Sequence, residues 1–146
     1  ESSRDTDHAL RARLAGEIER LKRNVEDHSR QLAERRVLDP LPALGRVCAK
    51  LDRLANLLRY AARGYHGVFD RCQLDETKLD ELYAFDLGLL DELAAIESSA
   101  QAVHGALEDA VALQRATRDL DRTLDAFDQL FSKRALLLEA PGGAAG

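Results

Sequence analysis

Three side chains that can bind a metal ion lie close together near the middle of the chain. His66, Asp70 and Cys72 fall within seven residues of one another, and each carries a metal-binding atom. Farther along, His104 and Glu108 are four residues apart and would share one face of a helix. Three mixed ligands in a glycine-containing segment are a weak pattern, and a helical pair of this kind is usually solvated. The sequence therefore predicts no metal site and no other cofactor.

Catalytic motifs do not occur in the sequence. It contains no Walker-type phosphate loop, no GxSxG turn and no HExxH motif. No histidine follows a glutamate by three residues, the spacing that di-iron bundles use. The two cysteines, Cys48 and Cys72, are too few for a disulfide framework. We therefore expect a protein that is not an enzyme and whose free thiols belong in the cytoplasm, with the periplasm as the alternative.

Two polar residues interrupt otherwise apolar patterns. His28 continues the alternating three- and four-residue spacing of the aliphatic residues before it, and Asp86 lies between Leu82 and Leu89 at the same spacing. This spacing is typical of a coiled-coil seam. A buried polar residue in such a seam specifies helix alignment at a cost in stability. We interpret both residues as specificity determinants, with a ligand site as the alternative.

Asp86 needs a partner if it is buried, because carboxylates are rarely found unpaired in a protein core. The sequence offers three basic candidates: His28, Arg59 and Arg63. In the alternative arrangement, Asp86 faces solvent and Phe85 or Leu90 takes the core position.

Aromatic residues cluster in one stretch, since five of the seven lie within residues 60–85. One interpretation is a hydrophobic plug that closes the end of a helical bundle. The other is a docking tip for a protein partner, because aromatic residues and arginine are enriched at interface hot spots. The candidate partner-binding residues are Arg59, Tyr60, Arg63, Tyr65, His66, Phe69 and Arg71.

The apolar spacing predicts an all-α fold. The first helix is expected over about 7–37 and the second over about 42–63, separated by the helix-breaking prolines Pro40 and Pro42. Gly64 is a plausible C-terminal stop. Residues 64–74 then form a hairpin loop with a short helical piece.

The second half of the chain predicts either two helices or one. A helix starts near Asp75, a suitable N-cap, and another covers about 100–139, with a weak break at Ser98-Ser99. Serine is only mildly unfavourable inside a helix, so one continuous helix is the alternative. At about 1.5 Å per residue, the inner helices would be roughly 35 Å long and the outer two roughly 45 and 60 Å. Such unequal lengths would leave ends that protrude or pair with another chain.

Charge is distributed unevenly along the sequence. The net charge is −5, which disfavours a nucleic-acid binder. Residues 41–72 hold six bases against two acids, whereas residues 73–99 hold eight acids against one base. We expect these two segments to form neighbouring antiparallel helices that attract each other. The alternative is a phosphate-binding stripe on the basic segment.

The length of the chain predicts a single domain. The 146 residues fit a single helical unit over 1–140, followed by a flexible Pro/Gly/Ala tail over 141–146. No run of about 18 apolar residues is available for a membrane span. The chain has no methionine and begins at Glu1, which suggests a domain cut from a longer protein.

These observations predict an antiparallel bundle of three to four long helices with coiled-coil-like heptad packing. The expected function is non-enzymatic: an oligomerisation, scaffold or adaptor domain that binds protein partners, most simply further copies of itself, and does not insert into membranes. The alternative is a sensor or binding module that holds a small ligand or metal in the bundle core or at the turn between the second and third helices.

Overall fold

The computed structural model describes residues 3–71 and 76–139, which fold into four helices. They are α1 (Ser3–Glu34), α2 (Leu41–Arg71), α3 (Glu76–Gly105) and α4 (Ala110–Glu139). No strand occurs in these two ranges. The all-α fold predicted from the sequence is therefore confirmed, while coiled-coil-like heptad packing stays a prediction.

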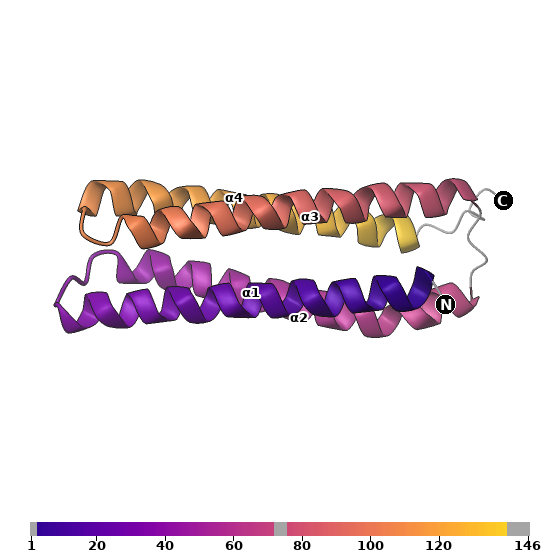
Figure 1. The fold of residues 1–146 in the computed structure, drawn as a ribbon, viewed down its shortest axis with the longest axis horizontal. Coiled ribbons are helices and arrows are strands. Elements are labelled where there is room, and N and C mark those ends of the chain that lie inside the picture. The colour runs from indigo at the N-terminus through magenta and orange to yellow at the C-terminus, as the bar shows by residue number, and fades with distance from the viewer. Residues whose placement is uncertain (1–2, 72–75, 140–146) are drawn as a thin grey trace.

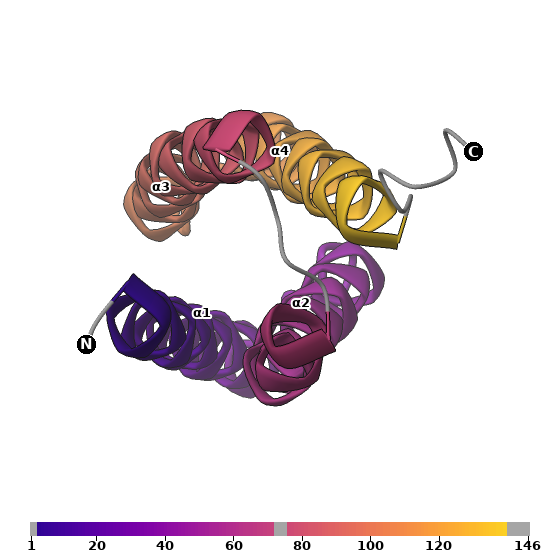
Figure 2. The ribbon, with the colours of Figure 1, turned by 90° about the vertical axis from the view of Figure 1, so that its right-hand side faces the viewer.

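The helices form two antiparallel hairpins that lie against each other along their length (Figure 1). One hairpin consists of α1 and α2 and the other of α3 and α4, and these are the most extensive helix contacts. The hairpins meet where α1 packs on α3 and α2 packs on α4, and each of these two pairs runs parallel (Figure 2). The side-chain contacts that join the hairpins accordingly link residues about 75 apart, such as Arg11 with Asp86 and Lys50 with Asp125.

The expected pairing between the basic and acidic segments is wrong. Within the described residues α2 makes no packing contact with α3. Three bases of α2 pair instead with acids of α4 and α1: Lys50 with Asp121 and Asp125, Arg53 with Asp128, and Arg59 with Glu19. Closeness in the sequence misled the prediction, because docking of the hairpins places α4 beside α2.

Local hydrogen bonds determine where α1 ends. The amide of Val37 donates to the carbonyl of Leu32, and the amide of Arg36 donates to that of Ala33. This pair of bonds is a Schellman motif, which requires a left-handed residue at its fifth position. Arg36 has that conformation, with φ 62°. Helix α1 therefore ends at Glu34, three residues before the predicted boundary.

The boundary between α3 and α4 lies at residues 106–109, so both the break at Ser98-Ser99 and the continuous helix are wrong. Asp109 caps α4, because its Oδ1 accepts a hydrogen bond from the amide of Ala112. Ser99 lies inside α3, and its hydroxyl is 3.2 Å from that of Thr123 on α4. A capping aspartate thus determines the turn, whereas the serine pair is accommodated within the helix.

Helix α2 does not end at Gly64 but continues to Arg71, so the predicted hairpin loop over 64–74 is wrong for residues 64–71. A glycine inside a helix costs only about 1 kcal/mol relative to alanine. The cost of Gly64 and Gly67 together is therefore too small to end the helix. The four helices therefore contain 32, 31, 30 and 30 residues. The predicted inequality of length is wrong, and the argument for protruding ends no longer holds.

The core lies between the helices and draws aliphatic residues from all four, among them Ile18, Leu51, Leu89 and Leu120. Phe127 adds one fully buried aromatic ring. Gly88 brings α3 close to α4, because a Cβ at this position would lie 3.2 Å from Leu130 Cδ2. Among the described residues, the buried polar side chains are few, and they are the first candidates for function: Arg11, His28, Asp86 and Thr117.

Candidate functional site

A buried ion pair joins the two hairpins. Arg11 Nη2 on α1 lies 2.5 Å from Asp86 Oδ1 on α3, and the Arg11 side chain has no exposed surface. Asp86 is buried, so the arrangement that placed it in solvent is wrong. Its partner Arg11 was not among the three candidates from the sequence, and Arg59 binds Glu19 instead.

The sequence contains a signal for Arg11 that the prediction missed. Extending the seam of His28 toward the N-terminus in alternating steps of three and four leads through Leu14 to Arg11. Arginine and aspartate therefore occupy matching seam positions on two parallel helices. Their pairing requires α1 and α3 to be neighbours, which the order of the helices in the chain does not show.

A second polar contact between α1 and α3 involves two histidines. The ring centroids of His28 and His104 are 5.0 Å apart, with 36° between the ring planes. His28 is buried, and its Nδ1 has no hydrogen-bond partner among the described residues. Burial lowers the pKa of His28 below its ordinary value of 6.5, the charge of His104 lowers it further, and Asp27 opposes both effects. No described cluster of three or more histidine, cysteine or acidic side chains completes a metal site.

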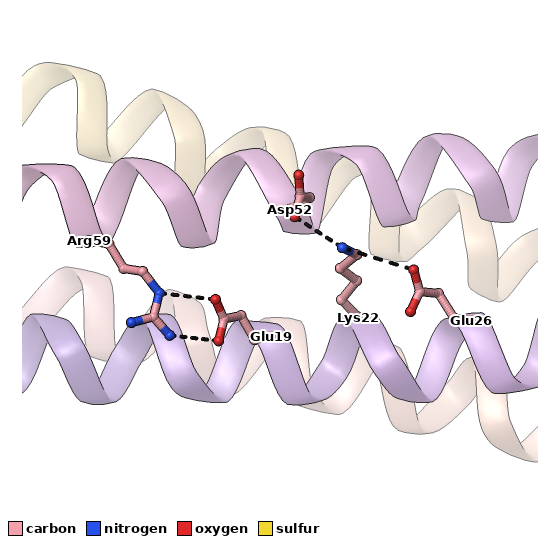
Figure 3. Close-up of polar contacts among 5 residues, drawn as sticks. All are labelled: Glu19, Lys22, Glu26, Asp52 and Arg59. Atoms are coloured by element: carbon pink, nitrogen blue, oxygen red, sulfur yellow. Dashed lines mark hydrogen bonds and ion pairs between the residues drawn. The ribbon is translucent and has the colours of Figure 1, made fainter.

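The predicted docking tip can be placed only in part. Arg59 lies at the interface of α1 and α2, where its Nε and Nη2 bind the two carboxylate oxygens of Glu19 at 3.0 and 2.6 Å (Figure 3). These hydrogen bonds hold the pKa of Glu19 below its ordinary value of 4.5. Tyr60, with 77% of its surface exposed, is not part of a hydrophobic plug.

The other predicted tip residues lie on helix rather than loop backbone, and their side chains are outside the described part of the structure. They are Arg63, Tyr65, His66, Phe69 and Arg71. Asp70 belongs to the same helical segment, and Cys72 lies outside the described residues. The metal pattern suggested by His66, Asp70 and Cys72 therefore stays untested.

Interhelical ion pairs line both edges at which α2 meets its neighbours. Lys22 Nζ of α1 lies 3.0 Å from Asp52 and 3.9 Å from Glu26 (Figure 3). Lys50 lies 2.9 Å from Asp121 and 2.8 Å from Asp125 on α4. Hydrogen bonds to these two acids raise the pKa of Lys50 above its ordinary value. These exposed pairs each add little stability, and of them only the Lys50 pairs join the two hairpins.

The outer face of α3, defined here as Ala84, Leu87, Leu90, Asp91 and Ala94, differs from the outer faces of the other helices where their side chains are described. Leu87 is 48% and Leu90 37% exposed, although Leu89 and Leu93 of the same helix are buried in the core. Single exposed leucines are ordinary, but two lie one turn apart here between exposed alanines. The apolar spacing predicted Leu90 only as a possible core residue, and this face was not predicted.

The fold and these sites define an all-α protein built from two helical hairpins, with buried polar contacts between them and two exposed leucines on the outer face of α3. Comparison with protein families, curated proteins and solved structures finds no match to this chain. None of the described helices is long and apolar enough to cross a membrane.

Proposed function

We propose that this chain is a non-enzymatic protein-interaction domain that binds a basic amphipathic helix along the outer face of α3. The observation that carries the proposal is the exposure of Leu87 and Leu90 on a helix whose opposite side is buried. A partner helix with apolar residues at three- and four-residue spacing would cover this strip, as in helix-in-groove recognition.

Charge argues for the basic character of the partner. Asp80, Glu81 and Asp91 are exposed beside the two leucines and form no ion pair with any described residue. Lysine or arginine on a partner helix would complement them, whereas a second copy of α3 would bring two acidic surfaces together. The homo-oligomer predicted from the sequence is therefore the alternative occupant of this face.

The test uses two labelled 21-residue helical peptides with identical leucines, one carrying lysine and the other glutamate at all flanking positions. Fluorescence anisotropy in 150 mM salt should show saturable one-to-one binding of the lysine peptide only. The double variant Leu87→Ser/Leu90→Ser should bind at least 10-fold more weakly. Val111→Ser, which alters an exposed aliphatic residue on α4, is the matched control and should bind as the parent does.

Equal binding of both peptides, or undiminished binding by the double variant, would overturn the proposal. Light scattering after size-exclusion chromatography provides the second arm. We expect a monomer at 50 μM. A dimer that the double variant dissolves would assign the face to a second copy of the chain and reject the basic partner.

A further inference from the structure

We propose a binding site for a small amphipathic anion, a carboxylate or phosphate joined to an apolar body, in a groove at the end of the molecule where both hairpin turns lie. The groove has a volume of about 1060 Å³ and is lined by the α1–α2 and α3–α4 turns, by residues 42–46 of α2 and by one face of residues 110–121 of α4. Pockets for small molecules usually occupy about 300–1,000 Å³. This end of the molecule is opposite the predicted aromatic tip (Figure 1).

The groove is locally cationic in a chain of net charge −5. Arg36, Arg46 and Arg118 line it from three different elements, and none forms an ion pair with a described residue. Two of the three acids in the lining are already matched, Glu108 by Arg35 at 2.8 Å and Asp121 by Lys50. Three guanidinium groups thus face a single unmatched acid, Asp39, and guanidinium is the side chain best suited to carboxylate and phosphate.

The backbone adds to this positive potential. Because α2 and α4 run parallel, both begin at the groove and direct the positive ends of their dipoles toward it. The carboxylate of Asp109 already caps α4, so the contribution comes mainly from the first turn of α2, Leu41–Leu44, which contains no acidic residue. Helix N-termini favour anions for this reason.

Thr117 supplies an independent observation. Its side chain lines the groove and is only 4% exposed, and its hydroxyl has no hydrogen-bond partner among the described residues. A buried hydroxyl without a partner costs roughly 1–3 kcal/mol. After rotation of the Thr117 side chain toward the groove, an anion bound there would accept this hydrogen bond and remove that cost.

The conformation of Arg36 points the same way. It occupies the left-handed position of the Schellman motif, φ 62°, where glycine is preferred. Strained residues of this kind cluster at ligand sites, where another role offsets the strain. Arg36 also lines the groove, so anion binding is the role that the proposal gives to its side chain.

Apolar residues in the groove lining indicate that the ligand carries an apolar body beside its anionic group. Val37 and Leu38 of the α1–α2 turn line the groove and are exposed, and Leu113 and Ala43 lie in the lining with them. An inorganic anion would leave these residues exposed, whereas an apolar body would cover them. A ligand bound here would lie at the α1–α2 and α3–α4 turns, not in the bundle core or at the turn between α2 and α3, where the sequence suggested a small-ligand site.

Isothermal titration calorimetry tests the site with octanoate and octyl phosphate, each kept below its micellar concentration. We expect saturable one-to-one binding of at least one of them, and the two titrations distinguish a carboxylate from a phosphate ligand. Neutral 1-octanol and inorganic phosphate should each bind at least 10-fold more weakly. If octanol binds comparably, the proposal that the ligand needs a negative charge is rejected. If inorganic phosphate binds comparably, the proposal that the ligand needs an apolar body is rejected.

Variants locate the site. Arg46→Gln/Arg118→Gln should weaken binding at least 10-fold, whereas Arg115→Gln, on the same helix but outside the groove, should leave it unchanged. Thr117→Val should weaken binding several-fold and raise the melting temperature of the ligand-free protein. A raised melting temperature would show that the weaker binding comes from the missing hydroxyl and not from a destabilised fold. Parental affinity in the double arginine variant, or no saturation of either ligand, would overturn the proposal.

Discussion

Arg11 and Asp86 form a buried ion pair between two parallel helices, with Arg11 Nη2 2.5 Å from Asp86 Oδ1. The two residues are 75 positions apart and belong to different hairpins. An ion pair in such a setting adds little net stability, because desolvation offsets the attraction between the charges. It does require α1 and α3 to dock in one register, since a shift along the helix axis would leave two charges buried and unpaired.

Removing one member of this pair should destabilise the protein strongly. Arg11→Met or Asp86→Leu alone takes a close ionic partner away from a buried charge, at a cost of about 3–5 kcal/mol. The double variant Arg11→Met/Asp86→Leu should recover most of this loss. Urea unfolding followed by circular dichroism measures all three. Additive losses in the double variant would show that the two side chains do not act as a pair.

Replacing Arg36 with glycine should stabilise the protein. The left-handed conformation, φ 62°, costs a residue with a side chain about 1 kcal/mol more than glycine. The melting temperature of Arg36→Gly should therefore rise. Arg35→Gly, one position earlier, lacks this strain and serves as the control, in which the melting temperature should not rise. A fall in stability for Arg36→Gly would mean that its side chain contributes more than the strain costs.

The His28–His104 contact should make stability depend on pH. Because the pKa of His28 is lowered in the folded state, the unfolded chain binds a proton near pH 6.5 that the folded chain does not accept until a lower pH. The free energy of unfolding should therefore fall as the pH decreases below about 6.5, and at pH 8 this contribution is absent. Urea unfolding at pH 8 and pH 5 should show a smaller decrease in His28→Leu than in the parent. An equal decrease in both would exclude His28 as the source.

Cys48 should resist alkylation in the folded protein. Burial raises the pKa of its thiol to about 11, and the thiolate is the reactive form. A Cys72→Ser variant isolates Cys48 for labelling with iodoacetamide at pH 8. The reaction should be at least 10-fold slower in the folded chain than in urea. Equal rates in the two states would contradict the burial of this side chain.

Much of the fold is predictable from local patterns. The spacing of the aliphatic residues places Ile18, Leu51 and Leu89 on buried faces, and the structure confirms their burial. Helix ends were predicted less well, because they depend on particular hydrogen bonds such as the cap of Asp109 and the left-handed turn at Arg36. The spacing of apolar residues predicts neither the cap nor the left-handed turn.

The candidate sites depend more on tertiary structure. Asp86 was identified from its seam position, but its partner was not, because the choice among basic residues depends on which helices become neighbours. The groove was not predicted, since Arg36, Arg46 and Arg118 come together only where the two hairpin turns meet; the phosphate-binding stripe considered for residues 41–72 included Arg46 alone of the three.

The sequence alone determined that this chain is helical and which face of most helices is buried, because both follow from interactions within a few residues along a helix. Only the tertiary structure decided that α2 lies against α4 and not α3, that Arg11 meets Asp86, and that both turns enclose one groove. The physical reason is that these contacts join residues far apart in the chain. Their formation depends on how two hairpins dock, and no local pattern encodes that choice.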